Sequence, residues 1–206
     1  MDCRLVCISR SLGAGGEEVG RRIAEAFGFR YADEEIIMRA AEKAGVSPET
    51  VADAERTPGL MVRILESIGR APIDPEGWSA HVYLVSEPPR SYEGLIVRVI
   101  REIAGEGSAV IVAHGASVPL AGTPGLLRVL VTGSAEGRAA RLASEAGLSE
   151  AEATKSVRES DRQRKDFLRR FYDISEELPT HYDMVVNTDV LTPAQAAAAV
   201  AAAVRG

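Results

Sequence analysis

Apolar positions along this chain alternate between short runs and stripes at helical spacing. The runs are bounded by glycine, proline or polar residues and are short, which predicts β-strands. They lie at residues 5–8, 29–32, 109–113, 126–132 and 184–186. Strands that alternate with helices are typical of an α/β fold, so we predict a doubly wound, five-stranded parallel sheet.

The segments between the runs predict helices. Val19 and Ile23 follow the first run at helical spacing, and Asp33 can cap the helix after the second run. Residues 149–152 and 192–195 carry capping-box patterns, in which a Ser or Thr and a Glu or Gln satisfy each other's exposed amides. We therefore expect helices to begin at both places.

One domain is expected for residues 1–206, because a chain of this length can bury a single substantial core. Residues 58–93 break the alternating pattern, since this segment contains several prolines and Trp78, the single tryptophan. We interpret it as an irregular insertion or small subdomain of that one domain.

Composition is that of an ordinary globular protein, with 46% apolar and 26% charged residues. The formal net charge of −6 argues against broad binding to nucleic acids or acidic membranes, which depends on an excess of Lys and Arg. No apolar run could span a bilayer and no signal-peptide pattern begins the chain, so we expect a cytoplasmic protein. The oligomeric state stays open.

A glycine-rich loop, S-R-S-L-G-A-G-G at residues 9–16, joins the first predicted strand to the first predicted helix. Glycines let backbone amides curl around an anion, and the N-terminus of the following helix adds a favourable dipole. We therefore favour a phosphate-binding loop over a plain turn.

The loop departs from the standard pattern G-x-x-x-x-G-K-[ST]. With Gly15 as the last glycine, Arg10 replaces the first glycine and Gly16 replaces the lysine. We assign Glu18 to the Ser or Thr that normally holds magnesium. Our hypothesis is that Arg10, or an arginine from elsewhere, supplies the missing cation. Glu17 and Glu18 would face solvent or help to hold a metal ion.

A dinucleotide-binding fold is the nearest rival interpretation of this loop. Gly13 and Gly15 match its G-x-G motif, and Asp33 lies at a suitable distance downstream to bind a ribose. However, Glu18 stands where a third glycine would permit close packing of the helix. The sequence therefore favours the mononucleotide type of phosphate loop.

A second candidate site is the basic stretch at residues 155–170. Arg158, Arg162, Lys165 and Arg169 recur at a spacing that places them on one helical face. Such a face is commonly no more than solvated. It also fits an arginine-rich lid that closes over transferring phosphates and offsets their charge. Both interpretations stay open.

Several segments resemble the cytidylate kinase-like family of P-loop proteins. Residues 6–10 and 13–16 are similar to its I-S-R-x-x-G-S-G-G signature, which also lacks the lysine, and residues 29–41 are similar to its tyrosine–aspartate step. The similarity continues in order at residues 99–104, 109–113, 161–164 and 182–188, and it leaves out residues 58–93.

The resemblance implies the fold of a P-loop nucleoside monophosphate kinase, in which residues 149–172 form a helical lid and residues 58–93 cover the acceptor. By the same resemblance, Asp33 would lie near the acceptor, and Arg138 and Arg141 would support the phosphate region.

One departure from the family lies after the third strand, where the family carries Gly-Arg and this chain has Ala113-His114-Gly115. His114 either substitutes in part for the arginine or is an ordinary polar residue. The change reduces the positive charge expected near an acceptor phosphate.

We expect transfer of the γ-phosphoryl group of ATP, with magnesium, to a nucleoside monophosphate such as CMP or dCMP. A non-catalytic nucleotide-binding module and a kinase of another small metabolite are the alternatives. The candidate catalytic residues are Arg10, Asp161, Arg162 and Arg164. ATP would contact Ser11, Gly13, Ala14, Gly15, Gly16, Glu17, Glu18, Arg138 and Arg141; the acceptor would contact Asp33, Arg39 and His114; and Glu18 or Asp33 would hold magnesium.

Overall fold

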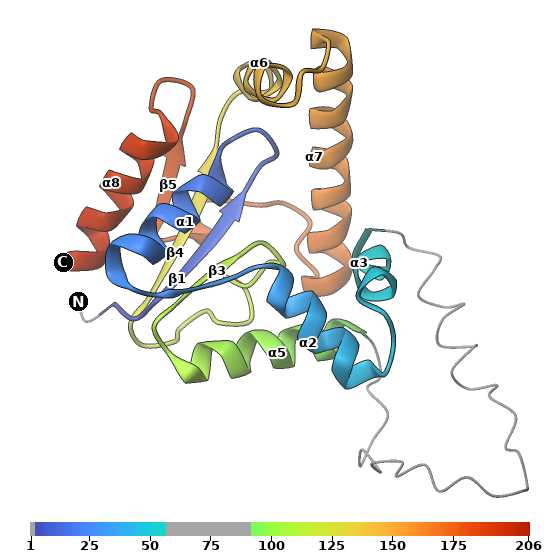
Figure 1. The fold of residues 1–206 in the computed structure, drawn as a ribbon, viewed down its shortest axis with the longest axis vertical. Helices are drawn as coiled ribbons and strands as arrows, with labels where there is room; N and C mark the ends of the chain where they lie inside the picture. Colours follow the sequence, from blue (N-terminus) through green and yellow to red (C-terminus); the bar gives the residue numbers. More distant parts are fainter. Residues whose placement is uncertain (1–2, 57–91) are drawn as a thin grey trace, which may run out of the picture.

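A parallel five-stranded sheet forms the centre of the computed structural model, which describes residues 3–56 and 92–206 (Figure 1). The strands are β1 (Leu5–Arg10), β2 (Arg30–Ala32), β3 (Ala109–Val112), β4 (Leu126–Thr132) and β5 (Met184–Asn187). Their order in the sheet is β2-β3-β1-β4-β5, and every pairing is parallel. The predicted doubly wound parallel sheet is confirmed, with its strands at the predicted positions.

Helices cover both faces of this sheet. The covering helices are α1 (Gly16–Phe27), α2 (Glu34–Ala44), α3 (Pro48–Arg56), α5 (Tyr92–Glu106) and α8 (Pro193–Arg205), and the chain also forms α6 (Ala135–Ala146) and α7 (Glu150–Tyr172). Alternate residues of β1 point to opposite faces, so Leu5 packs with α2, α3 and α5, whereas Val6 packs with α1 and α8. All residues of β3 are buried, as expected of an inner strand covered on both faces.

The α6–α7 pair lies beyond this sandwich, and α7 runs from α6 towards α3 (Figure 1). Ser149 and Glu152 form the predicted capping box at the start of α7, and Thr192 and Gln195 form the one at the start of α8. The helix α7 therefore coincides with the predicted lid at residues 149–172.

The predicted insertion at residues 58–93 lies outside the described residues, except that its last two residues begin α5. Within the described ranges, no helix is both long and apolar enough to cross a membrane. Cys7 is a free thiol in the core, and burial raises its pKa to about 12.

Candidate active site

The carboxyl ends of three neighbouring strands lie at one edge of the sheet, and candidate residues follow each of them. β1 ends at Arg10, Asp33 comes directly after β2, and His114 follows the end of β3. These strands pair in parallel in the order β2-β3-β1, so their ends point the same way. Ligands of open parallel sheets bind outside this edge.

The loop between β1 and α1 has the backbone that its glycines predict. Gly13 and Gly15 both have φ of +77°, in the left-handed region that favours glycine. Gly15 is the N-cap of α1 and provides no side-chain cap. The first amides of the helix are therefore open to a ligand, and an anion there would also gain from the helix dipole.

The carbonyl groups of the loop accept hydrogen bonds from side chains of α6 and of the residue after β5. Arg138, Arg141 and Thr188 donate to the carbonyl oxygens of residues 12, 13 and 14 over 3.3, 2.6 and 3.0 Å. Of the loop amides, those of Ser11 and Ala14 donate to backbone carbonyl oxygens over 3.1 and 3.0 Å, which leaves the other amides of the loop for an anion. The sequence predicted phosphate contacts for Arg138 and Arg141, whereas the structure places both guanidinium groups on the loop backbone.

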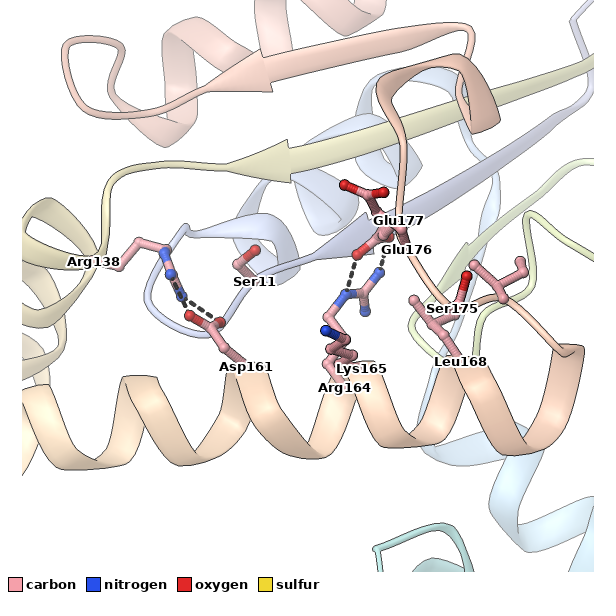
Figure 2. A pocket seen from close by; sticks show the side chains of 10 residues that line it. Ser11, Arg138, Asp161, Arg164, Lys165, Leu168, Ser175, Glu176 and Glu177 are labelled. Carbon is pink, nitrogen blue, oxygen red and sulfur yellow. Dashed lines mark hydrogen bonds and ion pairs between the residues drawn. The ribbon is translucent and has the colours of Figure 1, made fainter.

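A two-point ion pair joins α6 to α7 (Figure 2). Arg138 Nη1 and Nη2 donate to the two carboxylate oxygens of Asp161 over 2.9 and 2.7 Å. Arg138 Nε donates to the carbonyl of Gly133 over 3.0 Å, and only 6% of the Arg138 side chain is exposed. With these donors engaged, Arg138 braces the loop, and Asp161, predicted to be catalytic, holds Arg138 in place.

Farther along α7, Arg164 pairs with a residue that the sequence did not single out. Its Nε and Nη2 donate to Glu177 over 2.8 and 2.5 Å, and the Tyr182 hydroxyl donates to the same carboxylate. Burial works to raise the pKa of Glu177, but the hydrogen bonds and charge of Arg164, with the hydrogen bond of Tyr182 and the charge of His181, together outweigh it, and the pKa lies below its ordinary value. Glu177 lies in an irregular segment, where no periodic pattern points to it.

Both ion pairs line a cavity of about 610 Å³ between α7 and the segment that precedes β5 (Figure 2). Ser11 borders this first cavity from the glycine loop, and Lys165 borders it from α7. Its lining carries charges of both signs directly beside the loop. Such a lining suits a charged ligand better than an apolar one.

A second cavity, of about 620 Å³, collects candidate residues from four parts of the chain. Its lining includes Arg10 at the end of β1, Asp33 before α2, His114 after β3 and Arg164 on α7. Phe167 adds apolar surface to the same wall. Because Arg164 lines both cavities, α7 places this cation between them.

The carboxylate of Asp33 lies against His114 instead of capping α2. Asp33 occupies the N-cap position without a side-chain cap bond, while its Oδ1 lies 3.5 Å from His114 Nε2 and its Oδ2 accepts from Tyr31 over 3.4 Å. Burial works to raise the pKa of Asp33, but the hydrogen bond and charge of His114, with the charge of Arg10, outweigh it. The pKa lies below its ordinary value, so this carboxylate is ionised at neutral pH.

A left-handed turn presents His114 to Asp33. Ala113, His114 and Gly115 have φ of 68°, 52° and 61°, which costs about 1–2 kcal/mol for each residue other than glycine. Tyr172 donates to the carbonyl of His114 over 2.8 Å, and a Cβ at Gly115 would lie under 3.0 Å from the Tyr172 ring. The end of α7 therefore clamps the turn.

Some predicted residues outside the loop's glycine turn line neither cavity and pair with other residues instead. Arg39 is ion-paired with two glutamates, Arg162 has a 70% exposed side chain paired with the glutamate one turn earlier, and Glu18 pairs with the arginine one turn later on α1. In the standard pattern the Ser or Thr directly follows the lysine, which gives that position to Glu17 rather than Glu18. The Glu17 carboxylate accepts a hydrogen bond from Arg10 Nε.

Magnesium bound with a nucleotide keeps several waters and needs only one or two protein carboxylates besides the phosphates. The described residues contain no group of three or more His, Cys, Asp or Glu side chains that could hold a metal ion by themselves. Glu17, in the first turn of α1, and Asp33, in the second cavity, do provide carboxylates beside the loop. This donor set fits a magnesium ion held mainly by phosphates.

Comparison with known proteins agrees with this geometry. The model of the cytidylate kinase-like family matches residues 5–190. The fold is similar to that of an uncharacterised protein from Eubacterium ventriosum ATCC 27560, with 15% identity, a TM-score of 0.67 and coverage of 98% of this chain and 99% of that one. It is also similar to a shikimate kinase from Bacteroides thetaiotaomicron, with 12% identity, a TM-score of 0.50 and coverage of 98% and 96%. No curated protein matches the chain.

Proposed function

Because the chain belongs to the cytidylate kinase-like family and has a P-loop kinase fold, we propose that it transfers the γ-phosphoryl group of ATP to a nucleoside monophosphate. CMP and dCMP are the first acceptors to test. One observation carries the proposal: the open glycine loop and the cavity with Arg10, Asp33 and His114 lie at the same edge of the sheet. Phosphoryl transfer requires donor and acceptor to be positioned together in this way.

Arg164 is the lid cation that supports this reaction best. It lines both cavities, and its bond to Glu177 engages Nε and Nη2. A guanidinium group has five N–H donors, so Nη1 can contact a phosphate without loss of this pair. Arg164 would offset the charge that spreads over the transferring group in the transition state.

Asp33 is the group that we propose for the acceptor. Its ionised carboxylate can accept a hydrogen bond from an acceptor hydroxyl or amine, or from a water molecule of the magnesium ion. The magnesium ion, when bound, neutralises phosphate charge. His114 would lie beside the acceptor phosphate, and Phe167 and Ile37 give the cavity an apolar wall for a base.

A different acceptor is the second candidate, and His114 favours it. This residue stands where the family resemblance leads us to expect an arginine, so the cavity holds less permanent positive charge than an acceptor phosphate would use. A small phosphorylated or hydroxylated metabolite would then be the acceptor. A module that binds a nucleotide without catalysis is a third candidate, because Gly16 stands at the position of the lysine.

The deciding experiment measures ADP formation by the purified protein with ATP and magnesium against a panel of nucleoside monophosphates and small hydroxylated metabolites. We expect turnover with CMP or dCMP, and we expect Arg164→Ala to lower kcat by roughly 100-fold or more, because an arginine that contacts the transferring group contributes on this scale.

Arg162→Ala is the matched control, because it removes an arginine from the same helix at a position where the side chain is 70% exposed. Its kcat should stay close to that of the parent protein. Turnover only with a metabolite that is not a nucleotide would select the second candidate. Binding of ATP without turnover of any acceptor would select the non-catalytic module.

A further inference from the structure

The glycines of the loop are required for different structural reasons. Gly13 and Gly15 are required by their backbone, because both have φ of +77°. Gly16 begins α1, and its φ lies outside the left-handed region, so its backbone would accept any residue. A different reason must place a glycine at the position where a lysine stands in the standard pattern.

That reason is the side chain of Arg10. A Cβ added at Gly16 would lie under 3.0 Å from the Cβ of Arg10 and 3.3 Å from both its Cγ and its Cδ. The Arg10 Cβ is fixed by the backbone of β1, so the contact cannot be relieved by moving a flexible end. The stem of Arg10 therefore occupies the space in which a side chain at position 16 would begin.

The guanidinium group of Arg10 remains able to bind an anion. Its Nε donates to Glu17, and among residues 3–56 and 92–206 no hydrogen bond engages its two terminal nitrogens. Arg10 lines the second cavity together with Asp33. The terminal fork therefore has donors to spare at the end of β1, beside the open amides of the loop.

We propose that two positions of the standard phosphate loop have exchanged roles in this chain. Arg10, at the position of the first glycine, supplies the cation, and Gly16, at the position of the lysine, supplies the space that Arg10 needs. Arg10 crosses Gly16 and delivers to the β- and γ-phosphates of ATP the charge that the lysine delivers elsewhere. The inference deepens the proposed function, since it rests on a nucleoside triphosphate as the phosphoryl donor. It makes the two positions dependent on each other, so that a lysine at position 16 requires a glycine at position 10.

The test is a reciprocal exchange, measured as binding of ATP and of adenosine by calorimetry in the presence of magnesium. Arg10→Gly should weaken ATP roughly 10- to 100-fold, the range expected when a charged hydrogen-bonding group is lost, and leave adenosine unchanged. Gly16→Lys alone should weaken ATP as well, because the new side chain collides with Arg10. The double variant Arg10→Gly/Gly16→Lys should recover most of the lost affinity, because it restores the first glycine and the lysine of the standard pattern.

Two results would overturn the exchange. One is an Arg10→Gly variant that binds ATP as tightly as the parent protein or loses adenosine to the same extent, which would make Arg10 a structural residue. The other is a double variant that unfolds at the parent's temperature yet binds ATP no better than Arg10→Gly. Arg22→Ala is the control for loss of a cation, because Arg22 is an exposed arginine on α1 that pairs with Glu18.

The same variants separate this inference from the proposed function. If the parent protein binds ATP in an Arg10-dependent manner but phosphorylates no nucleoside monophosphate, the proposed acceptor is wrong and the exchange stands. If CMP is phosphorylated and the exchange variants show no recovery, the function stands and the exchange is wrong.

Discussion

At the scale of single residues, the ability of the phosphate loop to bind an anion depends on its neighbours. In the part of the chain that the structure describes, the neighbouring side chains donate to its carbonyl oxygens and do not occupy its amides. The family resemblance implied phosphate contacts for Arg138 and Arg141, but a guanidinium group can donate to carbonyl oxygens as well as to phosphate. The structure resolves this ambiguity, because Arg138 and Arg141 both donate to loop carbonyls. The glycines did predict the loop from sequence, and the structure gives the reason for two of them: Gly13 and Gly15 have a left-handed backbone, which favours glycine.

Gly13→Ala tests this close packing. The new Cβ would lie under 3.0 Å from the backbone carbonyl of Arg138, and φ is +77°, so we expect the free energy of unfolding to fall by roughly 2–4 kcal/mol. Gly28→Ala is the matched control, since Gly28 has φ of +65° but no atom within 4 Å of its added Cβ. It should cost about 1 kcal/mol. Equal losses in urea unfolding would show that the contact with Arg138 is not tight.

At the scale of helices, α7 holds the site through its pairs with other elements. Asp161 pairs with Arg138 of α6, Arg164 pairs with Glu177, and Tyr172 clamps the turn that carries His114. This makes α7 a brace for the loop as well as the candidate lid. Loosening its first pair should therefore affect both stability and nucleotide binding.

Asp161→Asn leaves the almost fully buried Arg138 without its charged partner. The Asp161 side chain is 42% exposed, so solvent screens its charge and reduces the cost of losing the pair. We expect the free energy of unfolding to fall by about 1–2 kcal/mol. ATP should bind more weakly, because Arg138 also holds the loop. Asp166→Asn, which breaks an exposed pair with Arg169 on the same helix, should cost under about 0.5 kcal/mol. Similar effects of both variants in urea unfolding would contradict the bracing role.

The helices and strands were predictable to within a few residues because buried parallel strands appear as apolar runs and capping boxes mark where helices begin. The partners of the site residues were not predictable in the same way. Glu177 lies in an irregular segment, and Arg162 and Arg164 look alike in sequence although one is exposed and the other largely buried. Sequence spacing gives a helical face only approximately, and tertiary packing decides which arginine turns inward.

At the scale of the whole molecule, two carboxylates fasten the chain around β5 to the rest of the fold. Glu177 pairs with Arg164 of α7, and Asp183 pairs with Arg128 of β4 over 2.7 Å. The hydrogen bond from Arg128 holds the pKa of Asp183 below its ordinary value. Burial raises the pKa of Glu177, but Arg164, Tyr182 and the charge of His181 together hold it below its ordinary value. Both carboxylates are therefore more acidic in the folded protein than in the unfolded chain.

A carboxyl group with a lowered pKa in the folded state stabilises that state above its unfolded pKa and loses this contribution as the pH falls through its folded pKa. For Glu177 the decline should begin near 4.5, the ordinary value, and continue below it. We expect the free energy of unfolding to be level around neutral pH and to fall steadily on acidification through this window. Urea unfolding at a series of pH values measures this fall in the free energy of unfolding.

Glu177→Gln separates this carboxylate from the others. The variant should be less stable than the parent protein at pH 7, because Arg164 loses its charged partner, and the difference should shrink as acid protonates Glu177 in the parent. The two curves should therefore converge below the folded pKa of Glu177. Curves that stay parallel down to pH 3 would mean that the loss at neutral pH comes from packing around the side chain and not from its charge.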